Sequence, residues 1–277
     1  NSLNLLKTDR LLTDISVLIA LAVFSTRFVP KLLNYFLYLS ELIIMKKILF
    51  TLALLISLSS FGQEDIGGNT YDYLTYGKQV WTVENAKMVT YRDGTPIPQV
   101  TDYLEWDALT TGAWSYYDND PRKPRFYNWY AVMGIHDTDP NTPNKEFAPE
   151  GWHVPSDTEW TTLENYLIAN DFNYDGTTKE NKIAKAMAST TGWFADSQTG
   201  APGNNQSINN SSGFNAFPEG NRLAGDFSDE SHEALFWTST ESSAVYAWGR
   251  DLGGNISYLY RNDINKREGI SVRFVRD

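Results

Sequence analysis

Few side chains in this sequence could carry catalysis. The 277 residues include three histidines and no cysteine, which excludes thiol catalysis, disulfide bonds and thiolate zinc sites. His153 stands close to Ser156 and Asp157, so a catalytic triad can be considered. The serine and aspartate are better explained as the cap and the acidic first turn of a helix. We therefore expect a protein that is not an enzyme.

Carboxylates are more numerous, and they leave two kinds of site open. With 34 Asp and Glu residues, some close pairs arise by chance. Asp226, Asp229, Glu230 and Glu233 could supply the pair of a polysaccharide hydrolase, although no spacing marks them and a solvated loop is the simpler interpretation. Oxygen ligands around 171–175 and 226–229 leave a structural calcium ion open. No cofactor and no other metal site is expected.

Residues suited to recognition gather near the C-terminus. Tyr, Arg and Asn together supply rigid contact area and adaptable hydrogen bonding. We expect Tyr258 and Tyr260 to share one strand face, with 261–265 forming the following turn, and it is equally open that one of these faces is core. The candidate ligand-binding residues are Tyr246, Arg250, Asn255, Tyr258, Tyr260, Arg261, Asn262 and Asn265.

Charge and composition limit the classes of partner that the protein can bind. From Gln63 onward, 31 acidic and 17 basic residues give a formal net charge of −14 without a basic cluster, which excludes nucleic acid. The same part holds 32 aromatic residues, including all nine tryptophans, so it can bury enough surface to fold. An extracellular glycan or a cell-surface protein is the expected partner, and the oligomeric state stays open.

Two helices are predicted to position these residues. Ser156 and Glu159 have the spacing of a capping box, and Trp160, Leu163 and Leu167 then recur along one helix face. A second, weakly amphipathic helix is predicted over 179–189.

The remaining pattern indicates strands and turns. A hairpin turn is expected at 253–255, a long surface loop at 196–212, and a half-buried alternation in the last strand. Strands are predicted at 127–132, 234–239, 244–252, 256–260 and 270–276. The fold class is therefore α+β.

Several sequence strings together resemble the Fibrobacter succinogenes major paralogous domain family of secreted Bacteroidetes proteins. The strings are Tyr-Gly-Lys-Gln-Val-Trp at 76–81 with Glu84 and Asn85, Tyr-Asn-Trp-Tyr-Ala-Val at 127–132, Gly-Trp-His-Val-Pro-Ser-Asp at 151–157, Phe-Trp-Thr-Ser-Thr-Glu at 236–241, and Ser-Val-Arg at 271–273. The resemblance implies a C-type-lectin-like fold, in which small mixed or antiparallel sheets, two helices and long loops present a ligand surface.

One departure from the family concerns cysteine. Family members commonly carry cysteines where this sequence has Ala148 and Phe274, as the resemblance implies. The loss of both is expected if they pair, and apolar volume would then replace a cross-link typically worth about 2–4 kcal/mol. We expect a core built from aromatic residues, including Trp129, Trp152, Trp160 and Trp237.

The N-terminal part has the pattern of a processing signal. Met45 is the first methionine, Lys46 and Lys47 follow it, and an apolar run covers 48–58. This run is shorter than the roughly 20 residues that span a bilayer, which favours a signal peptide over 45–62, cleaved before Gln63. The alternative is an uncleaved anchor that merges with the apolar stretches at 15–29 and 32–44.

These observations predict a domain organisation and a function. Residues 1–44 are interpreted as an upstream extension foreign to the protein, and 63–277 as one domain. The expected function is a secreted or periplasmic, non-catalytic binding module that recognises a glycan or protein through its C-terminal loops and strands, with no stable membrane anchor after cleavage. The alternatives are an extracellular hydrolase with a carboxylate pair and a structural or adhesive surface component.

Overall fold

The computed structural model describes residues 63–64, 67–223 and 226–277. These residues belong to one compact unit of the chain. The predicted signal peptide (45–62) and upstream extension (1–44) lie outside the described residues. No helix within the described ranges has the length and apolarity to cross a membrane.

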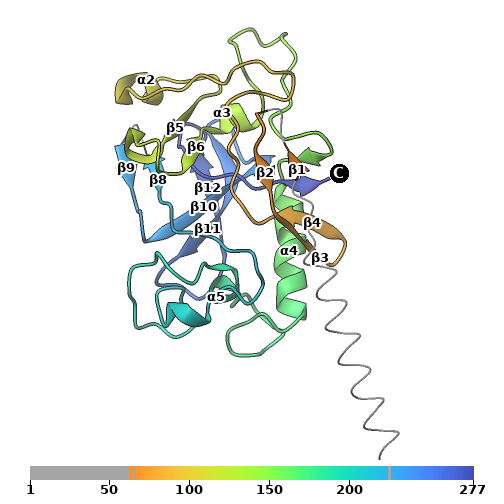
Figure 1. Ribbon diagram of the computed structural model, residues 1–277, viewed down its shortest axis with the longest axis vertical. Helices are drawn as coiled ribbons and strands as arrows, with labels where there is room; N and C mark the ends of the chain where they lie inside the picture. Colours follow the sequence, from red (N-terminus) through yellow and green to blue (C-terminus); the bar gives the residue numbers. More distant parts are fainter. Residues whose placement is uncertain (1–62, 65–66, 224–225) are drawn as a thin grey trace, which may run out of the picture. The chain divides into compact units, whose positions relative to one another are not determined.

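The described chain is a mixture of short helices and small antiparallel sheets, which confirms the α+β fold class (Figure 1). The helices are α2 (Tyr103–Asp107), α3 (Trp129–Val132), α4 (Asp157–Ala169) and α5 (Ala184–Met187), with 3-10 turns η1 (Tyr117–Asn119) and η2 (Gln206–Ile208). The strands are β1 (Gln63–Glu64), β2 (Thr70–Tyr71), β3 (Tyr73–Tyr76), β4 (Gln79–Thr82), β5 (Trp114–Tyr116), β6 (Arg125–Tyr127), β7 (Trp152–His153), β8 (Asn221–Leu223), β9 (Asp226–Ser228), β10 (Glu233–Glu241), β11 (Tyr246–Gly253), β12 (Tyr260–Asn265) and β13 (Val275–Arg276).

The predicted capping box and apolar face of α4 are confirmed. The Ser156 hydroxyl accepts a hydrogen bond from the Glu159 backbone N–H at 3.3 Å, and the Glu159 carboxylate accepts one from the Ser156 N–H at 2.8 Å. Trp160, Leu163 and Leu167 are buried. The indole of Trp160 packs edge-on against that of Trp81 in β4, with ring centroids 4.8 Å apart. Figure 1 shows α4 alongside β3 and β4, so this helix face closes one end of the core.

The sheet β10-β11-β12 confirms two predicted strands and corrects a third. The predictions at 234–239 and 244–252 correspond to β10 and β11. The strand predicted at 256–260 is wrong, because the turn at 253–255 opens a longer loop and β12 begins at Tyr260. In this loop Ser257 accepts a hydrogen bond from the Ala184 N–H, and the Leu259 N–H donates to the Asn181 side chain. The loop is therefore tied to the segment around α5 and not to a neighbouring strand.

The segment predicted as a strand at 127–132 is mostly helical. β6 ends at Tyr127, and Asn128 caps α3 by accepting a hydrogen bond from the Ala131 N–H at 2.9 Å. The same amide oxygen accepts a bond from the Ala113 N–H at 3.0 Å. A buried asparagine that satisfies two backbone donors thus outweighs the strand preference of its aromatic and β-branched neighbours.

The closing segment differs from the predicted half-buried strand. Its regular strand is only β13, and every residue from Ile270 to Val275 is buried. Ser271 and Arg273, expected on a solvent face, are 3% and 1% exposed. The segment pairs with or bridges to β4, β6, β7 and β10, and the segment 214–219 covers the polar face, where Ser271 contacts Glu219 and Arg273 donates to the Asn215 backbone oxygen.

The second predicted helix and the predicted surface loop pack together. The helix is only α5, and the loop at 196–212 is partly interior, with Ala201, Asn209 and Ser212 buried. The Lys185 ammonium of α5 is buried and donates to the Asn209 side chain at 2.9 Å and to the backbone oxygens of Ala201, Asn204 and Asn205. One buried cation therefore holds a loop that the sequence pattern placed on the surface.

The predicted aromatic core is confirmed. Trp129, Trp152, Trp160 and Trp237 are at most 6% exposed. Ala148 and Phe274 lie in the same hydrophobic cluster, and the Phe274 ring is 5.9 Å from that of Phe147. Apolar volume therefore occupies both positions where the family resemblance implies cysteine.

We expect Lys185→Met to lower the free energy of unfolding by about 1–3 kcal/mol, because it leaves buried carbonyl oxygens without a donor. Chemical denaturation measures this change, and hydrogen exchange should rise within 196–212. Lys182→Met is the matched control, since Lys182 makes partly exposed ion pairs with Asp175 and Glu180. Equal effects of the two substitutions would contradict the anchoring role of Lys185.

Candidate functional site

The predicted ligand residues lie on the β11–β12 hairpin and its connecting loop. The tyrosine side chains reach solvent, with Tyr246 41%, Tyr258 42% and Tyr260 46% exposed. Asn255 and Arg261 are exposed, and Asn262 and Asn265 are half-buried. Tyr258 and Tyr260 pack edge-on, with ring centroids 6.2 Å apart. The hairpin therefore presents large, partly ordered aromatic surface to solvent.

The segment 261–265 is a strand and not the predicted turn. Within β12, Arg261 pairs with Arg250, and Asn265 pairs with Tyr246. Since side chains alternate along a strand, these residues share one face of the hairpin, whereas Tyr260 and Asn262 lie on the other. The predicted residues of β11 and β12 thus lie on opposite faces of the hairpin.

Arg250 is the predicted residue that the structure removes from the surface. Its side chain has no exposed area and lies between the hairpin and α4. The guanidinium pairs with Asp157 at 2.7 Å and with Glu164 at 2.5 Å, and it donates to the Thr161 hydroxyl at 3.2 Å. The sequence signal for this role was the acidic first turn of α4, but only the tertiary structure brings it opposite β11.

Asp157 joins the buried arginine to an exposed one. Its carboxylate also accepts hydrogen bonds from Arg261 at 2.8 Å and 2.9 Å. Burial alone would raise the pKa of Asp157, but the two arginines outweigh it and hold the pKa below its usual value. The Arg261 guanidinium lies 3.2 Å from the ring centre of Trp248. Arg261 is thereby fixed in place while 42% of its side chain stays exposed.

Trp248 and Asp157 are members of this site that the sequence analysis missed. Trp248 precedes Arg250 by two residues in β11, so strand alternation could have placed both on one face. The pairing of Asp157 with Arg261 crosses 104 residues of sequence, and no local pattern marks it. We name the face formed by Tyr246, Trp248, Arg261 and Asn265 the hairpin face.

The acidic segment considered for hydrolysis lines a separate pocket. Asp229 and Glu233 border it together with Asp196, Phe194 and His232. The rings of Phe194 and His232 are stacked, with their centroids 5.0 Å apart. The neighbouring Asp251 is 9% exposed, and one of its carboxylate oxygens has no hydrogen-bond partner among the described residues. Burial and, to a smaller extent, the carboxylates of Glu233 and Asp229 raise the pKa of Asp251 to about 7.

The histidine considered for a triad belongs to an ion-pair chain. His153 contacts Glu159 and Asp277, each at 2.7 Å, while the Ser156 hydroxyl donates to Glu159. The hydrogen bond to Glu159 is the main cause that raises the pKa of His153 to about 9. A histidine that keeps its proton at neutral pH is poorly suited to act as the base of a triad.

Metal-ligand geometry is not found around either acidic stretch. Across 63–64, 67–223 and 226–277, no three His, Asp or Glu residues are grouped so that they could hold a metal ion. Near 171–175, the carboxylate of Asp175 pairs with Lys182 at 2.8 Å and accepts from the Thr177 hydroxyl at 2.6 Å.

Comparison with protein families found a match that covers most of the described chain. The model of the Fibrobacter succinogenes major domain matches residues 74–276. The chain belongs to this family. The match extends from β3 to β13 and thus includes α4, the hairpin face and the closing segment. Neither the comparison with curated proteins nor the comparison with solved structures found a match, so the C-type-lectin-like fold stays a prediction.

We expect Arg250→Ala to lower the free energy of unfolding by about 3–5 kcal/mol, because Asp157 and Glu164 would lose a buried counter-charge. Arg261→Ala should cost less than about 1 kcal/mol, since that side chain is partly exposed. Urea denaturation of both variants measures the difference. A mild effect of Arg250→Ala would show that the fold does not depend on this pair.

The raised pKa of Asp251 predicts a pH dependence. Between the ordinary aspartate pKa near 4 and about 7, the folded protein holds a proton that the unfolded chain has released, so this residue makes stability fall as pH rises. Asp251→Asn should therefore match the parent at pH 4 and exceed its stability by about 1–4 kcal/mol at pH 8. Asp263→Asn, at an exposed position of β12, is the control. Parallel stability curves for parent and Asp251→Asn would refute the shift.

Proposed function

We propose that this protein is an exported, non-catalytic binding module that recognises a glycan or protein outside the inner membrane. The hairpin face forms the main recognition surface, and the exposed Tyr258 and Tyr260 form a second patch, with Tyr260 on the opposite face of the hairpin. The observation that carries the proposal is the fixed, exposed Arg261, which is held by Asp157 and stacked on Trp248 on the same hairpin face as the exposed Tyr246. Export rests on the sequence pattern at 45–62.

The physical basis is the low cost of binding to side chains that are already ordered. Tyrosine, tryptophan and arginine dominate the energetics of recognition surfaces because they bury large area for few rotatable bonds. The Asp157 carboxylate restricts the rotamers of Arg261 before any ligand arrives. Part of the side-chain conformational entropy that binding would otherwise cost is therefore already lost when the chain folds.

A hydrolase is the second candidate, favoured by the carboxylates around Asp251. An acid with a pKa near 7 beside a second carboxyl group resembles the pair that glycoside hydrolysis uses. Asp229 and Glu233 border the adjoining pocket, whose volume is about 330 Å³. The low exposure of Asp251 counts against this candidate, since a general acid must reach the scissile oxygen.

Binding to a glycan array and capture of cell-surface proteins test the recognition surface. Tyr260→Ala and Arg261→Ala should each weaken binding at least about tenfold, which corresponds to 1.4 kcal/mol. Tyr103→Ala is the matched control, because Tyr103 is a 52% exposed tyrosine of α2. If both hairpin variants bind like the parent, the surface is misassigned.

Turnover assays separate the two candidates. The binding module should release no sugar from polysaccharide substrates, with or without Glu233→Gln. Hydrolysis that Glu233→Gln or Asp251→Asn abolishes would establish the enzyme instead.

N-terminal sequencing of exported protein should find Gln63 at the mature end, and a start upstream of Met45 would contradict export by a cleaved signal.

A further inference from the structure

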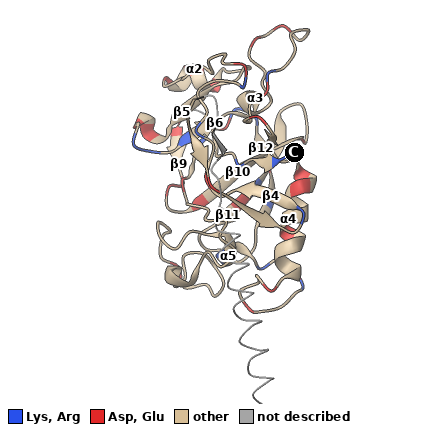
Figure 2. Cartoon of the chain, turned by 45° about the vertical axis from the view of Figure 1, so that its right-hand side comes forward, with Lys and Arg blue, Asp and Glu red and all other residues tan. Residues whose placement is uncertain are grey.

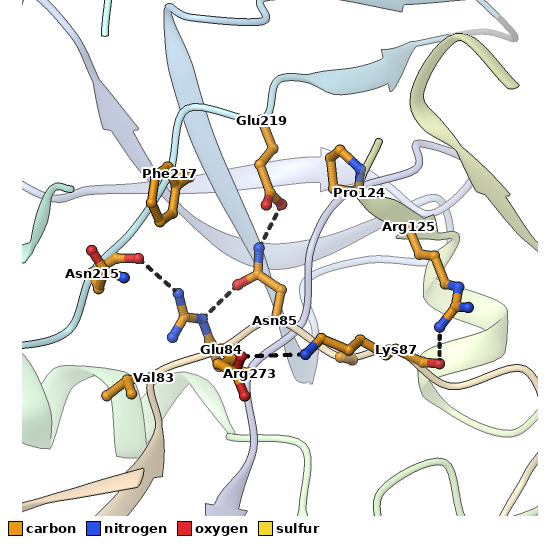
Figure 3. Close-up of a pocket in the computed structure, with 11 residues that line it drawn as sticks. Val83, Glu84, Asn85, Lys87, Pro124, Arg125, Asn215, Phe217, Glu219 and Arg273 are labelled. Carbon is orange, nitrogen blue, oxygen red and sulfur yellow. Dashed lines mark hydrogen bonds and ion pairs between the residues drawn. The ribbon is translucent and has the colours of Figure 1, made fainter. Parts of the chain in front are cut away.

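A second pocket lies away from the hairpin face, where the segment after β4 meets the start of β6 and the segment 215–219 (Figure 3). Its volume is about 230 Å³. The residues that matter for its chemistry are Asn85, Lys87, Phe217, Glu219 and Arg273. Asn85 and Arg273 belong to two of the strings that carry the family resemblance, so distant parts of the sequence build this pocket together.

The base of the pocket is a rigid polar network. One carboxylate oxygen of Glu219 (Oε2) accepts hydrogen bonds from the Asn85 amide at 2.5 Å and from the Ser271 hydroxyl at 2.9 Å. The Asn85 amide oxygen accepts from Arg273 Nε at 2.6 Å. Figure 3 shows Asn85 between Glu219 and Arg273, with its amide turned to both. The position of the Glu219 carboxylate is thus set before any ligand enters.

Arg273 cannot turn away from this network. It is 1% exposed and donates to the backbone oxygens of Thr82, Phe214 and Asn215, each at 3.2 Å. Its guanidinium also lies 4.8 Å from the ring centre of Phe214. The arginine therefore places a fixed positive charge behind Asn85.

One acceptor of the network is left for a ligand. The second carboxylate oxygen of Glu219 (Oε1) accepts no hydrogen bond from the described residues. Glu219 is half-buried, and burial raises the pKa of its carboxylate. At the rim, the Phe217 ring is 42% exposed, and the Lys87 ammonium makes a single hydrogen bond to a side chain, that of Glu84.

Charges of both signs line the pocket. Arg273, Lys87 and Arg125 repel a cation, Glu219 and Glu84 repel an anion, and Lys87 is already paired with Glu84, so neither sign of ligand charge matches the whole lining. A neutral hydroxyl can donate to Glu219, a second can accept from Lys87, and an apolar ring face can lie on Phe217. Pockets for drug-sized molecules hold about 300–1,000 Å³, so this one suits a smaller ligand.

We propose that this pocket binds one neutral sugar residue, held by the Glu219 carboxylate, the Lys87 ammonium and the Phe217 ring. The pocket shares no residue with the hairpin face. Its occupation does not depend on what the hairpin face recognises, so either proposal can fail alone.

Titration with free monosaccharides, followed by NMR or calorimetry, tests the site. The probes are glucose, galactose, mannose, xylose and N-acetylglucosamine, with inorganic phosphate and lysine as the anionic and cationic comparisons. We expect a Kd on the order of millimolar for at least one sugar, because a small ligand offers few contacts. Phosphate and lysine should not compete. Binding of phosphate or lysine at this pocket in place of any sugar would overturn the proposal.

Two variants locate the sugar. Glu219→Gln should weaken binding at least about tenfold, and Phe217→Ala by a similar factor. If Glu219→Gln disturbs folding through Asn85 and Ser271, the exposed Phe217 still tests the site. Phe194→Ala is the matched control, since Phe194 is 62% exposed and borders the other pocket. Unchanged sugar affinity in Phe217→Ala, or no binding of any sugar at tens of millimolar, would also overturn it.

Discussion

The structure depends on the buried closing segment, Ile270–Val275. This run bridges to β6 through Ile270 and to β10 through Ser271, and Val275 pairs with β4 and β7. Elements far apart along the chain are thereby joined through its last residues. Because the two larger hydrophobic clusters both include residues of this segment, neither of them is complete until the C-terminus is in place.

The protein buries arginine side chains in this segment and at two other positions. Arg222, Arg250 and Arg273 are at most 1% exposed, an unusual environment for a charged side chain. Arg222 and Arg273 donate to backbone oxygens of distant loops, whereas Arg250 pairs with two carboxylates of α4. Each guanidinium has several donors in a fixed plane, so one side chain connects several segments. In a chain without cysteine, these connections link parts that a disulfide could otherwise join.

Two of these buried arginines, Arg250 and Arg273, position the side chains of both surfaces proposed for binding. Arg250 fixes Asp157, which in turn orders the exposed Arg261 of the hairpin face. Arg273 fixes Asn85, which holds Glu219 at the base of the pocket. Figure 2 shows acidic residues at the start of α4, where Asp157 pairs with Arg250 and Arg261. The functional side chains are therefore positioned by buried charges and not by their own strands alone.

Short-range sequence patterns determined several elements of the fold. The capping box of α4, its apolar face, the strands β10 and β11 and the buried tryptophans all follow from short-range patterns, since caps, periodicity and burial preference act within a few residues. The family strings likewise predicted the family to which the chain belongs.

The tertiary structure decided what depends on distant partners. Arg250 was a candidate binding residue because arginine suits recognition surfaces, and only the packing of α4 on the hairpin buries it. Ser271 and Arg273 alternate with apolar residues, yet the distant segment 214–219 covers them. The pocket at Glu219 draws on segments separated by more than 130 residues, which no local pattern encodes. A sequence specifies such contacts only through the whole fold, because their free energy appears once all partners are buried together.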